Sequence, residues 1–161
     1  MHFITGGAFN GKKAWVKKTY HFTKKDHWIS AYANISLPLD LSNVRGDLLV
    51  IEGLEIWIKQ LIKKYDSSSC LEKWSECLDV WDTWEKADTC RQLVVIGTDI
   101  SKGIVPIEKE QRLWRDVTGW AYQDLAARST QVEWIWYGLN QTIKTERRDE
   151  NNEENYTSKI F

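Results

Sequence analysis

Short apolar runs alternate with longer segments of helical periodicity along most of the chain. Residues 48–51 and 93–96 are uninterrupted apolar runs, each followed by a glycine within two positions. Such runs are typical of strands buried on both faces of a parallel sheet. Residues 2–5 predict a shorter strand that runs into two glycines, and residues 28–32 predict another.

Helices are expected between these strands. Apolar side chains recur at helical spacing from Leu54 to Tyr65, with lysines on the opposite side, and again from Leu71 to Trp81. Residues 12–22 predict a helix directly after the first loop, and a long helix should follow Pro106. Residues 132–137 and 141–143 flank Gly138 and predict a hairpin at the edge of the sheet.

The order of these elements predicts the fold class. Strands that alternate with helices indicate an α/β fold, with a mostly parallel sheet, helices on both faces and a short C-terminal edge hairpin. The length of 161 residues fits one domain, which we place at residues 1–144. Residues 145–161 are charged and amide-rich with almost nothing apolar, so we expect a disordered tail.

Charge and composition exclude several classes of function. With 22 basic and 23 acidic side chains, the net charge of -1 does not indicate nucleic acid or any strongly charged partner. Ten tryptophans could stack on exposed bases, but most occupy positions where a core would use them. Three cysteines without a CxxC pair fit neither a disulfide framework nor a zinc site, so they are interpreted as reduced thiols. No bilayer span or signal peptide is evident, and the cytoplasm is the expected location.

The first loop carries the pattern G-x-x-x-x-G-K at residues 6–12, here called the glycine loop. A glycine-rich turn lets successive backbone N–H groups converge on phosphate oxygens at the start of a helix, and the lysine reaches the terminal phosphates. A structural glycine turn without a nucleotide is the alternative. The candidate nucleotide-binding residues are Gly6, Gly7, Ala8, Phe9, Asn10, Gly11, Lys12 and Lys13.

Lys13 departs from the pattern, because the next position is normally Ser or Thr, whose hydroxyl ligates magnesium. An ammonium group cannot ligate a cation. Either water and acidic side chains alone hold the metal, or Lys13 takes over part of the metal's role in neutralising the phosphate charge. Glu52, directly after a buried strand, is the candidate metal ligand, and Glu55 is the second choice. For Glu52 the competing interpretation is a carboxylate favoured by the dipole at a helix N-terminus.

Several ordered segments resemble one enzyme family. Residues 98–106 are similar to its N-E-V-G-x-G-I-V-P segment, residues 112–119 to its R-x-F-R-D-x-x-G, and residues 122–126 to its N-Q-x-L-A. Residues 4–8 match its opening T-G-G-A/V. The chain thus resembles the bifunctional adenosylcobinamide kinase/adenosylcobinamide-phosphate guanylyltransferase family of cobalamin biosynthesis, over most of residues 1–144.

The resemblance implies a P-loop NTPase-like fold and transfer of the terminal phosphate of ATP or GTP to the aminopropanol hydroxyl of adenosylcobinamide. Mg²⁺ would accompany the nucleotide, Lys12 and Glu52 would be catalytic, and Glu52 would bind the metal. A homo-oligomer is also implied. The expected substrate-binding residues are Thr98, Asp99, Gly103, Ile104, Val105 and Pro106.

The second activity of that family, GMP transfer through a guanylylated histidine, lacks its histidine segment here. If residues 28–32 form the second strand, His21 and His27 both precede the place where that histidine belongs, and this alignment is favoured. If His21 is aligned with that histidine instead, a helix and a strand are missing. Guanylyl transfer is therefore the less supported half. A nucleotide- or corrinoid-binding protein without turnover is the alternative function, and a scaffold whose glycine loop is only a turn is the third.

Overall fold

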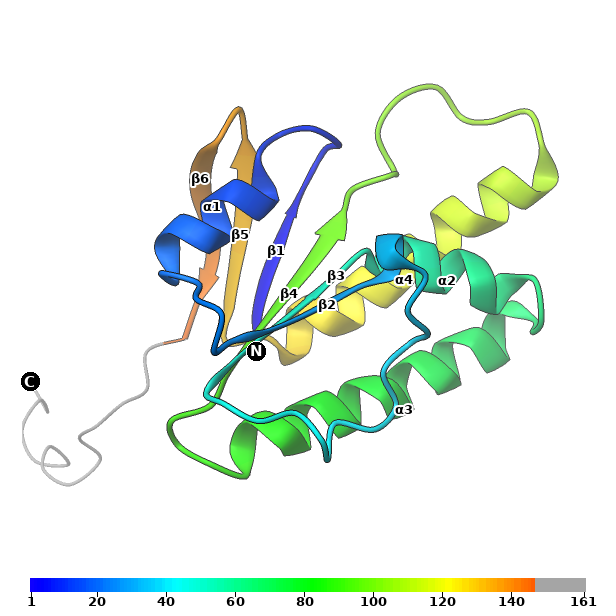
Figure 1. The fold of residues 1–161 in the computed structure, drawn as a ribbon. Coiled ribbons are helices and arrows are strands. Elements are labelled where there is room, and N and C mark those ends of the chain that lie inside the picture. Colours follow the sequence, from blue (N-terminus) through cyan, green and yellow to red (C-terminus); the bar gives the residue numbers. More distant parts are fainter. Residues whose placement is uncertain (147–161) are drawn as a thin grey trace, which may run out of the picture.

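Six strands form one sheet in the order β2-β3-β4-β1-β5-β6, in a computed structural model that describes residues 1–146 (Figure 1). All neighbouring strands are parallel except β5 and β6, which form the antiparallel edge hairpin that the sequence predicts. The elements are β1 (His2–Gly6), α1 (Lys12–Thr19), β2 (His27–Ser30), η1 (Ala31–Ala33), β3 (Leu48–Glu52), α2 (Leu54–Ile62), α3 (Ser67–Lys86), β4 (Gln92–Thr98), α4 (Lys109–Arg128), β5 (Gln131–Trp136) and β6 (Leu139–Thr145).

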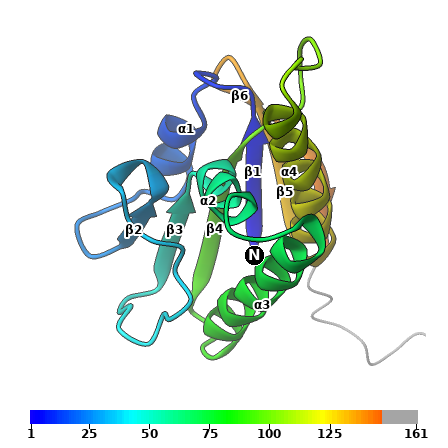
Figure 2. The ribbon, with the colours of Figure 1, turned by 90° about the vertical axis from the view of Figure 1, so that its right-hand side faces the viewer.

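The helices cover the two faces unequally. Helices α2, α3 and α4 pack on one face and enclose the larger core, whereas α1 alone packs on the other (Figure 2). Successive residues of β3 alternate between these cores, so Leu49 faces the larger one and Val50 the smaller one. The predicted α/β class, with a P-loop-like mostly parallel sheet, is confirmed.

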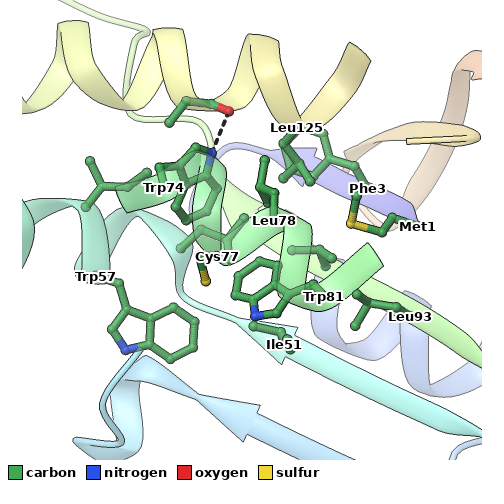
Figure 3. Close-up of a cluster of buried hydrophobic side chains, with 14 of the residues drawn as sticks. Met1, Phe3, Ile51, Trp57, Trp74, Cys77, Leu78, Trp81, Leu93 and Leu125 are labelled. Atoms are coloured by element: carbon green, nitrogen blue, oxygen red, sulfur yellow. Dashed lines mark hydrogen bonds between the residues drawn. The ribbon is translucent and has the colours of Figure 1, made fainter. Parts of the chain in front are cut away.

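Tryptophans fill the larger core (Figure 3). The indole N–H of Trp74 donates to the carbonyl of Ala121 in α4 at 3.0 Å. Those of Trp57 and Trp81 donate to backbone carbonyls at residues 35 and 38, at 2.8 and 2.9 Å. Tryptophans of α2 and α3 therefore hold the irregular segment between η1 and β3 in place. These three indole rings act as core residues.

Three boundaries differ from the sequence prediction. Strand β2 ends at Ser30, because the chain turns into a 3₁₀ helix that closes with Asn34 at a φ of 58°. Helix α1 ends at Thr19, just before His21 takes a φ of 50°. Asp66 does not end a helix: its carboxylate accepts a hydrogen bond from the Ser69 N–H at 2.7 Å and caps the start of α3.

The structure also bears on the predictions for the cysteines, a membrane span and the C-terminal tail. Cys70 and Cys77 are fully buried in α3, deeper than the partly buried positions expected, and all three cysteines are free thiols. Within residues 1–146, no helix is both long enough and apolar enough to cross a membrane. The predicted tail lies outside the described residues from position 147 on, and β6 includes Thr145.

Candidate functional site

A cleft of about 1160 Å³ opens at the carboxyl ends of β1, β3 and β4. Strands β1 and β4 are neighbours, but the helices that follow them, α1 and α4, lie on opposite faces of the sheet. Connections that diverge in this way leave a crevice at the carboxyl edge, where open α/β sheets bind their ligands. The topology therefore favours the edge beside the glycine loop as the candidate binding site.

The glycine loop is tightly held on both sides. Gly6 has a φ of 146°, and a Cβ there would lie 2.3 Å from the carbonyl oxygen of Ile135. The Asp99 N–H donates to the carbonyl of Gly6 at 2.9 Å, and the Gly138 N–H donates to that of Asn10 at 2.8 Å. The path of this loop is thus set by contacts to the β4–α4 connection and the edge hairpin.

Helix α1 begins directly at the cleft. Gly11 precedes it in a left-handed conformation, with a φ of 89°, and no side chain of the described residues caps the first turn. Backbone N–H groups at a helix start have no partner within the helix, and the dipole makes this end electropositive. Five of the eight candidate nucleotide-binding residues line the cleft, namely Ala8, Phe9, Gly11, Lys12 and Lys13.

Lys12 folds back over the glycine loop. Its ammonium group donates to the carbonyl of Gly7 at 2.7 Å, and the residue is 8% exposed. Burial lowers the pKa of Lys12, whereas the nearby carboxylates of Glu55, Asp99 and Glu52 raise it. The ammonium group of Lys12 therefore lies on the glycine loop, where the pattern requires a positive charge for phosphate.

Glu52 lies at the end of β3 on the opposite wall of the cleft and is 6% exposed. Its carboxylate accepts a hydrogen bond from the ammonium group of Lys13, with 3.2 Å between nitrogen and oxygen. The same ammonium group lies 5.1 Å from the ring centre of Trp28. The candidate metal ligand is therefore paired with the residue that replaces the usual hydroxyl.

Glu55, the second choice for a metal ligand, is a buried anchor. Its carboxylate accepts hydrogen bonds from the Tyr32 hydroxyl and from the Thr98 N–H at 3.1 Å. The Tyr122 hydroxyl donates to the Thr98 carbonyl at 3.0 Å and shares this hydrogen with Glu55 over a longer distance of 3.4 Å. Burial and the Glu55 charge raise the pKa of Tyr122 well above its usual range, so this phenol stays protonated as a donor. The three donors come from η1, β4 and α4, which Glu55 holds together.

The predicted substrate-binding residues separate into two groups. Thr98 lines the cleft, and Asp99 lines a smaller pocket of about 440 Å³ between β1 and α4. Gly103, Ile104, Val105 and Pro106 line neither, and Ile104 is 96% exposed. The structure therefore brings only the start of this segment to the site.

Other residues of the cleft were missed by the sequence analysis. Several of them belong to helices or strands whose sequence carries no binding motif. Trp114 is held in place by a hydrogen bond from its indole N–H to the Glu55 carbonyl at 2.8 Å. Trp114 lies within the R-x-F-R-D-like segment, which was the one available signal. The missed lining residues include Lys17, Trp28, Tyr32, Ile35 and Trp114.

None of the three histidines of the chain lines the cleft. His2 lies at the amino end of β1, and burial lowers its pKa to about 4, so it is neutral at pH 7. His27 begins β2, three residues before the carboxyl edge, and His21 is exposed after α1. The histidine that the guanylyl route would require is therefore not found among the residues that line this cleft.

A family model described as cobinamide kinase / cobinamide phosphate guanyltransferase matches residues 18–143, more than three quarters of the chain. The chain belongs to this family. The family is enzymatic and uses nucleoside triphosphates and cobinamides, so membership supports a role in cobalamin biosynthesis. No curated protein matches the chain. Residues 6–12 precede the matched range, so the glycine loop is assigned from its pattern and geometry.

Magnesium, which the family implies beside the nucleotide, fits the side chains of this cleft poorly. No group of three or more His, Cys, Asp or Glu side chains in residues 1–146 could hold a metal ion. Nucleotide-bound Mg²⁺ needs only one or two protein oxygens, but Lys13 has none to offer and its ammonium group already engages Glu52. Glu55 is occupied by its three donors.

Proposed function

We propose that the chain binds the triphosphate of ATP or GTP on the glycine loop and transfers the terminal phosphate to the aminopropanol hydroxyl of adenosylcobinamide. One observation carries this proposal: Lys12 and the uncapped start of α1 line the same cleft at the carboxyl edge of the sheet. Three kinds of phosphate donor, namely loop N–H groups, the helix start and an ammonium group, converge there.

The bound state requires one rearrangement. Lys12 exchanges the Gly7 carbonyl for a phosphate oxygen, which replaces a neutral acceptor by an anion and strengthens the hydrogen bond. Phosphoryl transfer depends mainly on positioning and charge stabilisation, so a held cation and a fixed loop supply most of what the reaction needs. Glu52, which the sequence proposed as catalytic, is here a positioning residue that holds Lys13.

The corrinoid is assigned to the part of the same cleft that η1, α2 and α4 line. Apolar side chains form much of that wall, including Ile35, Ile56 and Trp114. They suit the aminopropanol arm better than a phosphate. The exposed residues 103–106 would contact the corrinoid from outside the cleft, as the family resemblance implies.

Guanylyl transfer is not part of this proposal. The histidine route needs an imidazole beside the α-phosphate, and no histidine lines the cleft. The same absence, together with Lys13, favours a second candidate: a nucleotide- or corrinoid-binding protein on the same fold that does not turn over. Neither candidate assigns protein ligands to Mg²⁺, because the side chains of the cleft fit the ion poorly.

The kinase assignment can be tested with the full chain, adenosylcobinamide and ATP or GTP, with and without Mg²⁺. Mass analysis should show an adenosylcobinamide that has gained one phosphate. Lys12→Ala should lose both nucleotide binding and product. Lys18→Ala removes an exposed lysine of α1 that does not line the cleft, so it serves as the matched control.

The outcomes separate the two candidates. Product formation that depends on Lys12 supports the kinase. Nucleotide binding without product in any of these buffers supports the binding protein. Unchanged nucleotide affinity in Lys12→Ala would refute the kinase and the nucleotide-binding form of the second candidate, since each places the phosphates at this lysine.

Self-association is the least constrained part of the proposal. The family resemblance implies a symmetric oligomer, and the edge hairpin exposes apolar side chains that a second copy of the chain could cover. Analytical ultracentrifugation of the chain tests this, and a monomer at all concentrations contradicts it. The exposed hairpin residues are Trp136, Tyr137, Leu139 and Ile143.

A further inference from the structure

Lys13 occupies the position after the loop lysine, where the pattern calls for a hydroxyl that ligates a metal. Its side chain is 56% exposed and lines the cleft, whereas the Glu52 side chain that holds it is only 7% exposed. The pair therefore consists of a buried carboxylate and a cation at the cleft surface. It differs from an ordinary surface ion pair, in which both groups are free in solvent.

A divalent cation and the Lys13 ammonium group compete for the same place. Both need the Glu52 carboxylate, and like charges a few ångströms apart repel each other inside a partly desolvated cleft. The ammonium group offers three N–H donors and no lone pair, so it cannot join a coordination shell. With the side chains as they lie, Lys13 occupies one of the two Glu52 oxygens that a metal would need and places a like charge beside it.

Lys13 can instead perform the metal's electrostatic task. One N–H donates to Glu52, which leaves two donors that can engage phosphate oxygens. Lys12 reaches the same loop from the preceding position, so two ammonium groups flank the place of the triphosphate. Lys12 belongs to the ordinary pattern, so Lys13 adds one further positive charge where the pattern has a hydroxyl and a metal ion. Charge-assisted N–H donors of this kind bind phosphate strongly.

We propose that Lys13, held by Glu52, is a built-in cation that replaces the divalent metal, so that this chain binds nucleoside triphosphates without Mg²⁺. This inference rests on the proposed nucleotide site and adds that triphosphate binding at this site does not require a divalent ion. It predicts that the usual dependence of triphosphate binding on a divalent ion is weak here and is restored when a hydroxyl returns to position 13.

The test is calorimetric titration of the full chain with GTP and with ATP, in EDTA and in excess Mg²⁺. For the natural sequence we expect dissociation constants in the two buffers that agree within about threefold. Lys13→Thr should bind about tenfold or more weakly in EDTA and regain affinity with Mg²⁺, because a charge-assisted contact is lost and a metal ligand is gained. Lys18→Thr, an equal loss of charge on the same helix, should behave like the natural sequence.

Failure of this inference differs from failure of the proposed site. Binding by the natural sequence only in Mg²⁺ overturns the built-in cation and leaves the nucleotide site standing. No binding of either nucleotide in either buffer refutes the proposed site itself. A Lys13→Thr variant that binds equally well in EDTA also overturns the inference, since Lys13 then contributes nothing.

A second variant keeps the test independent of the folding of Lys13→Thr. Glu52→Gln removes the carboxylate but keeps a hydrogen-bond acceptor for Lys13. If Glu52 only holds the ammonium group, affinity for GTP in EDTA should stay equal or rise, because an anion near the triphosphate is gone. If Glu52 ligates a metal, this variant should instead lose affinity specifically in Mg²⁺, which contradicts the proposal.

Discussion

Two loops at the carboxyl edge of the sheet carry the family-like segments, and they are built in opposite ways. The glycine loop is fixed by backbone hydrogen bonds to Asp99 and Gly138 and leaves no room for a side chain at Gly6. The β4–α4 connection, residues 99–108, is anchored at its start, but its middle is open, and Gly103 has nothing within 4 Å of an added Cβ.

The two loops differ in how rigidly the fold holds the groups that would contact a ligand. The glycine loop lies between packed neighbours, so its N–H groups and Lys12 have defined positions before any ligand arrives. Such preorganisation reduces the entropy lost on binding. The middle of the β4–α4 connection is more open, since Ile104 and Val105 are exposed. Its contacts come from flexible side chains, with Lys102 over the Trp134 ring and Arg112 on the carbonyls of residues 106 and 107.

The largest expected effect comes from adding a methyl group at the two glycines. Gly6→Ala should lower the free energy of unfolding by about 3 kcal/mol or more, because the new Cβ meets the Ile135 carbonyl and the φ is positive. Gly103→Ala, with a φ of 101° but open surroundings, should cost only about 1 kcal/mol. Urea unfolding measures both, and equal losses would show that the two loops are equally constrained.

Substitution of one lysine from each loop, Lys12 and Lys102, should change nucleotide affinity to very different extents. Lys12→Ala removes a charge-assisted phosphate contact and should weaken binding about 100-fold. Lys102→Ala removes a cation that lies 3.6 Å from the ring centre of Trp134 and should change affinity by less than about threefold. Titration calorimetry gives both values. A larger loss from Lys102→Ala would move the phosphate site to the β4–α4 connection.

Glu55→Gln should have an intermediate effect on stability. The amide keeps one oxygen acceptor but loses the charge that three donors share, so we expect a loss of about 1–2 kcal/mol in the free energy of unfolding. The anchored start of the β4–α4 connection should then exchange its Thr98 amide hydrogen faster. A stable variant with unchanged exchange would mean that Glu55 does not hold this strand end.

Ile104→Ser should have the smallest effect on the folded chain. At 96% exposure the side chain packs on nothing, so stability should change by less than about 0.5 kcal/mol. If residues 103–106 contact the corrinoid, the KM for adenosylcobinamide should rise while nucleotide affinity stays constant. Steady-state kinetics with varied adenosylcobinamide decides this, and an unchanged KM would remove Ile104 from the substrate site.

Much of this fold follows from local patterns in the sequence. The runs at 48–51 and 93–96 have the length and flanking glycines typical of buried strands, and those glycines mark the carboxyl edge where the cleft opens. The end of β2 could not be predicted from its apolar residues. Its position depends on Asn34 in a left-handed turn and on packing against α2.

The site was predictable only in part, for the same reason. A spacing rule finds Lys12, and a strand-end rule finds Glu52, but neither shows that Lys13 and Glu52 form an ion pair across the cleft. Tyr32 and Tyr122 are 90 positions apart in the chain and meet at Glu55 only through the fold. Contacts of this kind depend on tertiary geometry that no local pattern encodes.

Hydrogen exchange read by mass spectrometry, with and without saturating GTP or ATP, tests the central claim most directly. The account predicts that either nucleotide slows exchange in peptides that cover residues 6–13, while peptides from residues 101–107 change little. Slowed exchange confined to residues 101–107, or no change anywhere, would contradict the assignment of the nucleotide site to the glycine loop.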